Sequence, residues 1–327
     1  MKSNKLIGIL LKLIIGVASF AIIYWRIKKE LTVENMDLLV DALTNSSGLL
    51  LIATSILLFP VNWGIESYKW MLITAQIQKI NYVTSTKSVY AGICVGNLAP
   101  GRATEFLAKI HFFKPENRIS ITVLHFVNGM FQLSITVLFG LLALLLRSNS
   151  SQTNDEWLKT ISIILSAVVM LGFVLALFNI NKLMNWLYKR FSKHSSAQAV
   201  HISWGNGLLG KLFFFAFVRY LVFSFQFILL MHVFNVQANY VYLLTGIYIY
   251  FLFTTIIPMF SIIEAAVRTA IALVVFSDLG LSNAALAVVA VLLWLINIVF
   301  PSIVGYVILL RENLSLSSFT FKNKNAS

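Results

Sequence analysis

Cysteine and charge are both scarce in this chain of 327 residues. Cys94 is the only cysteine, which excludes an intrachain disulfide and a zinc site built from several cysteines. Charged residues make up only 11% of the sequence. The five histidines lack metal-ligand spacing, and neither a nucleophile elbow nor a kinase-like signature occurs. We therefore expect no metal, no cofactor and no enzymatic activity, with an intramembrane lipid-modifying enzyme as an alternative.

Long apolar runs are the main feature of the sequence. Hydrophobic residues make up 59% of the chain, and weakly charged segments of about 18 residues or more recur, which is the length that a helix needs to cross a membrane. The sequence therefore predicts an all-α integral membrane protein with a single transmembrane domain over residues 1–327. The net charge of +13 lies in short stretches between the runs, which is typical of topology signals and anionic lipid contacts rather than nucleic-acid binding.

The predicted spanning helices share length and low charge, and they cover residues 6–25, 48–74, 119–146, 157–178, 207–234 and 284–310. The first of them resembles a signal peptide in layout but lacks a convincing cleavage site, so we expect it to stay as a helix. A short surface helix is predicted over residues 31–43. The basic connector 179–206 carries apolar residues at helical spacing, which favours an interfacial amphipathic helix.

Two further apolar segments are interrupted by proline. The first covers residues 87–113 and is broken at Pro100-Gly101, and the second covers residues 240–276 and is broken at Pro258. Each arm of the first is only about 18 Å long at 1.5 Å per residue, which is too short to span. The arms of the second are about 27 Å long by the same rise. We expect both segments to form re-entrant hairpins.

The distribution of Lys and Arg predicts the orientation. Basic segments are predicted to be cytoplasmic, together with both termini; they are residues 109–118, 179–206 and 311–324. Loops poor in basic residues are predicted to lie outside; they are residues 147–156, 235–239 and 277–283. The half over residues 48–146 then mirrors the half over residues 207–310 in opposite orientation. This inverted repeat is an architecture that recurs in transporters.

The run Asn97-Leu98-Ala99-Pro100-Gly101-Arg102-Ala103-Thr104-Glu105, with the later Pro258, Glu264 and Arg268, resembles the flippase-like transmembrane region of the lysylphosphatidylglycerol synthases. The resemblance covers about residues 6–310. In the two-part synthases a soluble aminoacyltransferase domain follows this region. Only about seventeen residues follow Leu310 here, so we do not expect lysyl transfer in this chain. The resemblance implies lipid translocation or lipid binding.

Arg102 and Glu105 are the first candidate site residues, because they share a face of the outgoing arm of the first hairpin. A helix that starts at Pro100-Gly101 would point its free amide hydrogens toward the tip, where Arg102 could join them on a lipid phosphate. Asn97, in the same motif, is a further substrate-binding candidate. The alternative is that Arg102 and Glu105 form a purely structural pair.

Other ionisable residues within apolar segments extend the candidate site. Glu264 and Arg268 are four residues apart in the second half, where they either bind substrate or satisfy each other. Arg219 lies in the middle of a predicted helix, where an unpaired charge is costly. Glu66 lies near the cytoplasmic end of its helix and serves as a substrate-binding candidate or as an internal partner of Lys69.

These observations predict a flippase-like transporter in the inner membrane. The expected substrate is an anionic phospholipid or a polyprenyl-type lipid, bound at a midplane site between the two hairpins and moved by alternating access. A homo-oligomer or a separate lipid-modifying enzyme is a possible partner, and nucleic acid is not expected. A scaffold subunit of an envelope complex is the remaining alternative.

Overall fold

The computed structural model describes residues 32–99, 102–150, 207–236, 238–256, 264–279 and 281–312, together with isolated positions between 10 and 25 and between 160 and 186. Every regular element in these ranges is a helix. The predicted all-α class is therefore confirmed. The predicted helices over residues 6–25 and 157–178 and the connector 179–206 lie outside the described residues apart from isolated positions, as do Pro100, Gly101 and Pro258.

Within the described ranges, four helical segments are long and apolar enough to cross a membrane. They are α3 (Ser46–Thr74), α6 (Arg118–Ser150), α9 (Leu208–Val233) and the continuous run of α12 (Asn283–Trp294), η4 (Leu295–Val299) and α13 (Phe300–Arg311). Each was predicted as a spanning helix, with boundaries that differ by a few residues. A shorter helix, α2 (Val33–Thr44), packs against α3 and α12 and corresponds to the predicted surface helix.

Two pairs of shorter helices stand where the interrupted segments were predicted. The first pair is α4 (Tyr82–Gly96) and α5 (Glu105–Ile110), followed by η2 (Pro115–Asn117). The second pair is α10 (Tyr240–Ile256) and α11 (Glu264–Val275), followed by η3 (Ser277–Leu279). With 15 and 6 residues, α4 and α5 are about 22 Å and about 9 Å long. Neither helix of the first pair can span a membrane.

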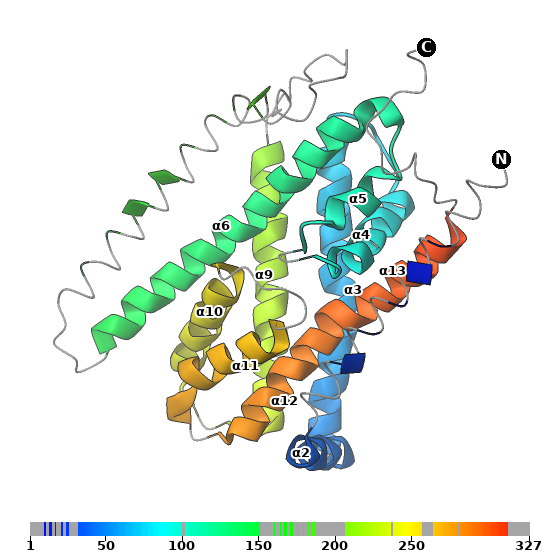
Figure 1. Cartoon of the computed structure of the whole chain (residues 1–327). Helices are drawn as coiled ribbons and strands as arrows, with labels where there is room; N and C mark the ends of the chain where they lie inside the picture. The colour runs from blue at the N-terminus through cyan, green and yellow to red at the C-terminus, as the bar shows by residue number, and fades with distance from the viewer. Residues whose placement is uncertain are drawn as a thin grey trace.

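The short pairs lie in opposite halves of the bundle. Figure 1 shows α4 and α5 in the upper half of the view, between α6 and α13, and α10 and α11 in the lower half. The long helices α3 and α9 pack along each other, α4 packs on α13, and α10 packs on α6. The contact of α4 with α13 is backbone-close, since a Cβ atom on Gly305 would lie 2.0 Å from the carbonyl oxygen of Tyr90. Glycine is therefore required at this crossing.

The last long helix contains a π-helical turn, η4, just before Pro301. Proline has no amide hydrogen, and its ring collides with the carbonyl group four residues earlier in a regular α-helix. The wider π turn relieves this conflict, and such turns are frequent at functional sites. The side chain of Asn297, within the turn, donates to the Leu293 carbonyl oxygen at 3.2 Å. The helix is thereby irregular at one defined point along its length.

Candidate functional site

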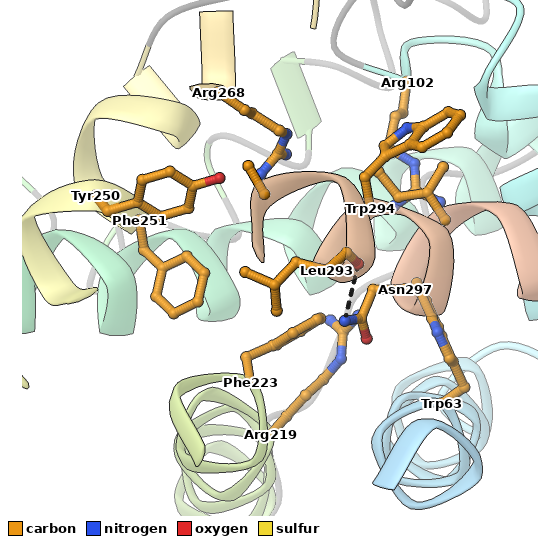
Figure 2. A pocket seen from close by; sticks show the side chains of 12 residues that line it. Trp63, Arg102, Arg219, Phe223, Tyr250, Phe251, Arg268, Leu293, Trp294 and Asn297 are labelled. Carbon is orange, nitrogen blue, oxygen red and sulfur yellow. Dashed lines mark hydrogen bonds between the residues drawn. The ribbon is translucent and has the colours of Figure 1, made fainter. Parts of the chain in front are cut away.

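The irregular turn borders a cavity of about 120 Å³ that we call the arginine cavity. Arg219 comes from α9, Arg268 from α11, and Arg102 from the segment between α4 and α5. Figure 2 shows Arg219 rising from below and the side chains of Arg102 and Arg268 reaching in from the other side of η4. The remaining walls are mainly aromatic and aliphatic and include Trp63, Phe223, Tyr250, Phe251 and Trp294.

A second cavity, of about 130 Å³, adjoins the first and is called here the carboxylate chamber. Trp63, Arg102 and Arg219 line both cavities. The chamber adds two acidic, two basic and several polar side chains, namely Glu66, Glu105, Lys69, Lys109, His125, Asn128 and Gln132. Together the two cavities bring five Lys or Arg side chains and two carboxylates into one buried centre, which therefore carries a net positive charge.

Glu66 binds three other residues of this centre. One carboxylate oxygen accepts a hydrogen bond from the Asn128 amide at 2.8 Å. The other lies 3.0 Å from Arg219 Nη1 and 3.0 Å from Lys69 Nζ. Three helices, α3, α6 and α9, are thus joined through a single carboxylate with 6% exposure. A buried carboxylate held by two cations is an organising charge, because removing it would leave both cations uncompensated.

The polar connections continue from Arg219 to the irregular helix. Arg219 Nε donates to Asn62 Oδ1 at 2.9 Å, and the Asn62 amide donates to Asn297 Oδ1 at 3.0 Å. The Arg219 guanidinium also lies over the Trp63 ring, 4.8 Å from its centroid. The position of Arg219 at the cavity wall is therefore fixed by contacts with α3, and Asn62 links it to η4.

Glu105 organises the other side of the chamber. Its carboxylate lies 2.7 Å from Lys109 Nζ and 3.6 Å from Arg102 Nε. Lys109 Nζ is also 3.3 Å from His125 Nδ1 on α6 and 4.8 Å from the centroid of the Trp70 ring. Lys109 is 1% exposed, so its charge is buried although it belongs to the segment 109–118 that was predicted to be cytoplasmic from its basic residues. The local Glu105 side chain attracts it inward.

Arg102 adopts an unusual backbone conformation. Its φ angle is 59°, in the left-handed region that non-glycine residues seldom occupy and that is often found at functional sites. Two of its guanidinium nitrogens, Nε and Nη2, are buried and make no hydrogen bond within the part of the chain that the structure describes. The backbone amide of Arg102 donates to the Ala99 carbonyl oxygen at 3.1 Å in a tight turn. This turn places the Arg102 guanidinium group, with its two nitrogens that make no hydrogen bond, at the wall of both cavities.

The predicted start of a helix at Pro100-Gly101 is wrong. The helix begins at Glu105 rather than at Pro100, and it has only six residues. The left-handed conformation at Arg102 prevents a continuous helix before that point, and Thr104 uses its hydroxyl group to donate to the Val95 carbonyl oxygen at 2.6 Å.

The structure places most of the predicted site residues together. Arg102, Glu105, Glu66, Arg219 and Arg268 all line one or both cavities. Asn97 lies elsewhere, because its side chain donates to the Ser302 hydroxyl group at 2.5 Å and joins the end of α4 to α13. Glu264 is the first residue of α11, and its side chain lies outside the described set.

Several residues of the centre were not predicted as site residues. They are Lys69, Lys109, His125, Asn128, Gln132 and Trp63. A signal for three of them was present, since His125, Asn128 and Gln132 are spaced three and four apart and form a polar face on an otherwise apolar helix. Across the described ranges, no group of three or more His, Cys, Asp or Glu residues could hold a metal ion.

A multi-pass helical bundle with a buried, positively charged polar centre defines the class of the molecule as an integral membrane protein. Residues 9–305 match the family described as the lysylphosphatidylglycerol synthase TM region. The chain belongs to this family, which confirms the resemblance seen in the Arg102 motif and links the protein to a membrane lipid-related function. No curated protein matches the chain.

Proposed function

We propose that this protein binds the phosphate group of an anionic membrane lipid in the arginine cavity and moves the lipid between leaflets without modifying it. The observation that carries the proposal is the convergence of Arg102, Arg219 and Arg268, from three separate elements, on one cavity. None of the described residues that line this cavity carries a carboxylate. The cavity therefore presents positive charge that an anion can neutralise.

Arginine suits this role chemically. Its planar fork donates parallel hydrogen bonds to phosphate oxygens, and Arg102 has two buried nitrogens with no hydrogen bond within the described ranges. A lipid headgroup that leaves water loses its hydration, which is costly unless polar groups replace it. The three guanidinium groups replace that hydration, while the aromatic wall of the cavity accommodates the apolar part of the lipid next to the phosphate.

The arrangement of the short helices supports a transport cycle. In our proposal α4 with α5 and α10 with α11 are re-entrant hairpins of an inverted repeat, entered from opposite sides of the inner membrane, with both termini cytoplasmic. The two helix pairs lie in opposite halves of the bundle (Figure 1), and Arg102 and Arg268 bring one residue of each repeat half to the same cavity. Exchange of conformation between the halves would expose the cavity to each side in turn.

Leaflet transfer in proteoliposomes tests the proposal. The purified full chain is reconstituted with fluorescent lipids of matched acyl chains, and the fraction that a membrane-impermeant quencher reaches is followed over time. We expect faster exchange of anionic phospholipid than of zwitterionic phospholipid, because only the former brings a net negative charge to the positively charged centre. Protein-free liposomes provide the control. Equal rates with and without protein would contradict transport.

Cysteine accessibility tests the first hairpin. The side chain of Gln78, before α4, accepts hydrogen bonds from the Lys114 backbone amide at 3.1 Å and from Asn117 at 3.0 Å, after α5. In a Cys94→Ser background, Lys79→Cys and Lys114→Cys are therefore expected to react with a membrane-impermeant maleimide from the same side. Ser277→Cys, beyond α11, is expected to react from the opposite side. Labelling of Lys79→Cys and Lys114→Cys from opposite sides would exclude a re-entrant α4–α5 pair.

A further inference from the structure

His125 is the histidine that lines the carboxylate chamber, where α6 packs against the short helix α5. Its ring is partly buried and packs edge-on against Trp70 of α3, with centroids 6.3 Å apart. Its Nδ1 atom lies 3.3 Å from Lys109 Nζ. An ammonium group can only donate a hydrogen bond, so Nδ1 is the acceptor and His125 is neutral in this arrangement.

A line of contacts joins His125 to the wall of the arginine cavity. Lys109 Nζ, which donates to His125, lies 2.7 Å from the Glu105 carboxylate. The same carboxylate lies 3.6 Å from Nε of Arg102. This last distance is longer than a hydrogen bond. Arg102 is therefore the loosest member of the line, and it is also the member that lines the arginine cavity.

An anion bound by Arg102 changes the charge balance of this line. A phosphate group competes with Glu105 for the Arg102 guanidinium group, which leaves Lys109 as the main partner of the carboxylate. The added negative charge favours a further cation beside Glu105. Histidine is the side chain that can supply one near neutral pH. The other charged groups that face the chamber are already paired with one another, and they are Glu66, Lys69 and Arg219.

Resting on the proposed function, we infer that His125 takes up one proton when the anionic lipid binds and releases it when the lipid leaves. The proton comes from water and forms an N–H bond with the lone pair of Nδ1. Lys109 then loses this acceptor and keeps its contact with Glu105. Because the lipid-bound protein holds more protons than the free protein, lipid affinity is higher below the histidine range of pH and falls as the pH rises through it.

The pH dependence of binding tests this inference. The purified full chain in detergent is titrated with short-chain phosphatidylmethanol, whose single phosphodiester charge is constant over the range used, and tryptophan fluorescence is followed. Titrations at about pH 5.5 and about pH 8 bracket the ordinary range of histidine. We expect about fivefold to tenfold tighter binding at the lower pH, as uptake of up to one proton predicts.

Calorimetry at about pH 6, near the ordinary pKa of histidine, counts the protons directly. The heat of binding is compared between two buffers of different ionisation enthalpy, MES and bis-Tris. A proton taken up by the protein is supplied by the buffer, so the measured heat should differ between the two buffers in proportion to the uptake.

His125→Asn keeps an acceptor near the position of Nδ1 and cannot be protonated at these pH values. We expect its affinity to differ by no more than about twofold between the two pH values, which would leave no appreciable proton linkage, and its heat of binding to be independent of the buffer. His125→Gln is a second variant with the same expectation. His232→Gln is the matched control, because His232 lies in the last turn of α9 and stacks on Tyr240; it should keep the full pH dependence. Melting temperatures verify that the variants fold.

The outcomes separate the inference from the proposed function. Equal lipid affinity of the wild type at the two pH values would overturn the inference and leave anion binding intact. An unchanged pH dependence in a folded His125→Asn or His125→Gln protein would overturn it as well, as would its loss in His232→Gln. Failure of phosphatidylmethanol to bind at either pH would instead contradict the proposed function itself.

Discussion

Glu66→Gln is expected to lower the free energy of unfolding by about 3–5 kcal/mol, the usual cost of removing one partner from a buried ion pair. Glutamine has nearly the same volume, so the loss is electrostatic rather than a packing defect. Arg219 and Lys69, each 3.0 Å from the carboxylate, would both remain buried without a counter-charge. Denaturant titration of the purified protein, followed by tryptophan fluorescence, measures the change.

Two further variants test whether the loss of stability in Glu66→Gln comes from the uncompensated cations. Glu116→Gln removes an exposed carboxylate of η2 and should change the stability by less than about 0.5 kcal/mol, as is usual for surface substitutions. The double variant Glu66→Gln/Lys69→Met should be more stable than Glu66→Gln alone, because one of the two uncompensated cations is gone. If Glu66→Gln is as stable as Glu116→Gln, the carboxylate does not organise the centre.

Arg102→Gln is expected to weaken binding of anionic phospholipid about tenfold to a hundredfold and to slow its leaflet transfer in proportion. A hydrogen bond to a charged group contributes about 1.5–3 kcal/mol, and 1.4 kcal/mol corresponds to a factor of ten. The folded protein should keep most of its stability, since Arg102 makes only a long ion pair with Glu105, 3.6 Å from Nε, and Glu105 keeps its closer partner Lys109 at 2.7 Å. Lipid titration and the proteoliposome assay provide the two measurements.

Lys87→Gln is the matched control for the loss of one positive charge. The Lys87 side chain is 48% exposed and is paired with Glu312 on the surface, 3.3 Å away, so its removal should leave lipid affinity within about twofold, as expected for an exposed ion pair. Arg102→Lys should recover only part of the affinity, because an ammonium group cannot make the two parallel hydrogen bonds of a guanidinium group. A folded Arg102→Gln protein with wild-type affinity would exclude a direct role of Arg102 in binding.

The order of the helices could be predicted from the sequence because each depends on local composition. The apolar runs that became α3, α6, α9 and α12–α13 are long enough to cross a membrane, and this length alone distinguishes them from soluble helices. The proline breaks likewise indicated where two segments would be shorter. What the sequence could not predict was the backbone at Arg102, since a left-handed arginine has no local signature and is held by the surrounding turns.

The charged residues show most clearly what the sequence could predict and what it could not. A buried charge within an apolar segment is costly and needs a partner, so Arg219 and Glu66 could be selected from the sequence as candidate site residues. Their pairing could not be predicted, because they are 153 residues apart and meet only where α9 packs along α3.

The sequence by itself therefore determined the class of the protein, the four long helices that the structure describes and five of the seven charged residues of the centre, because hydrophobic length and isolated charge are local properties. Only the tertiary structure decided that Arg102, Arg219 and Arg268 face one cavity and that Lys109 is drawn inside by Glu105. These relations depend on how helices distant in the chain pack together, and no local pattern specifies that packing.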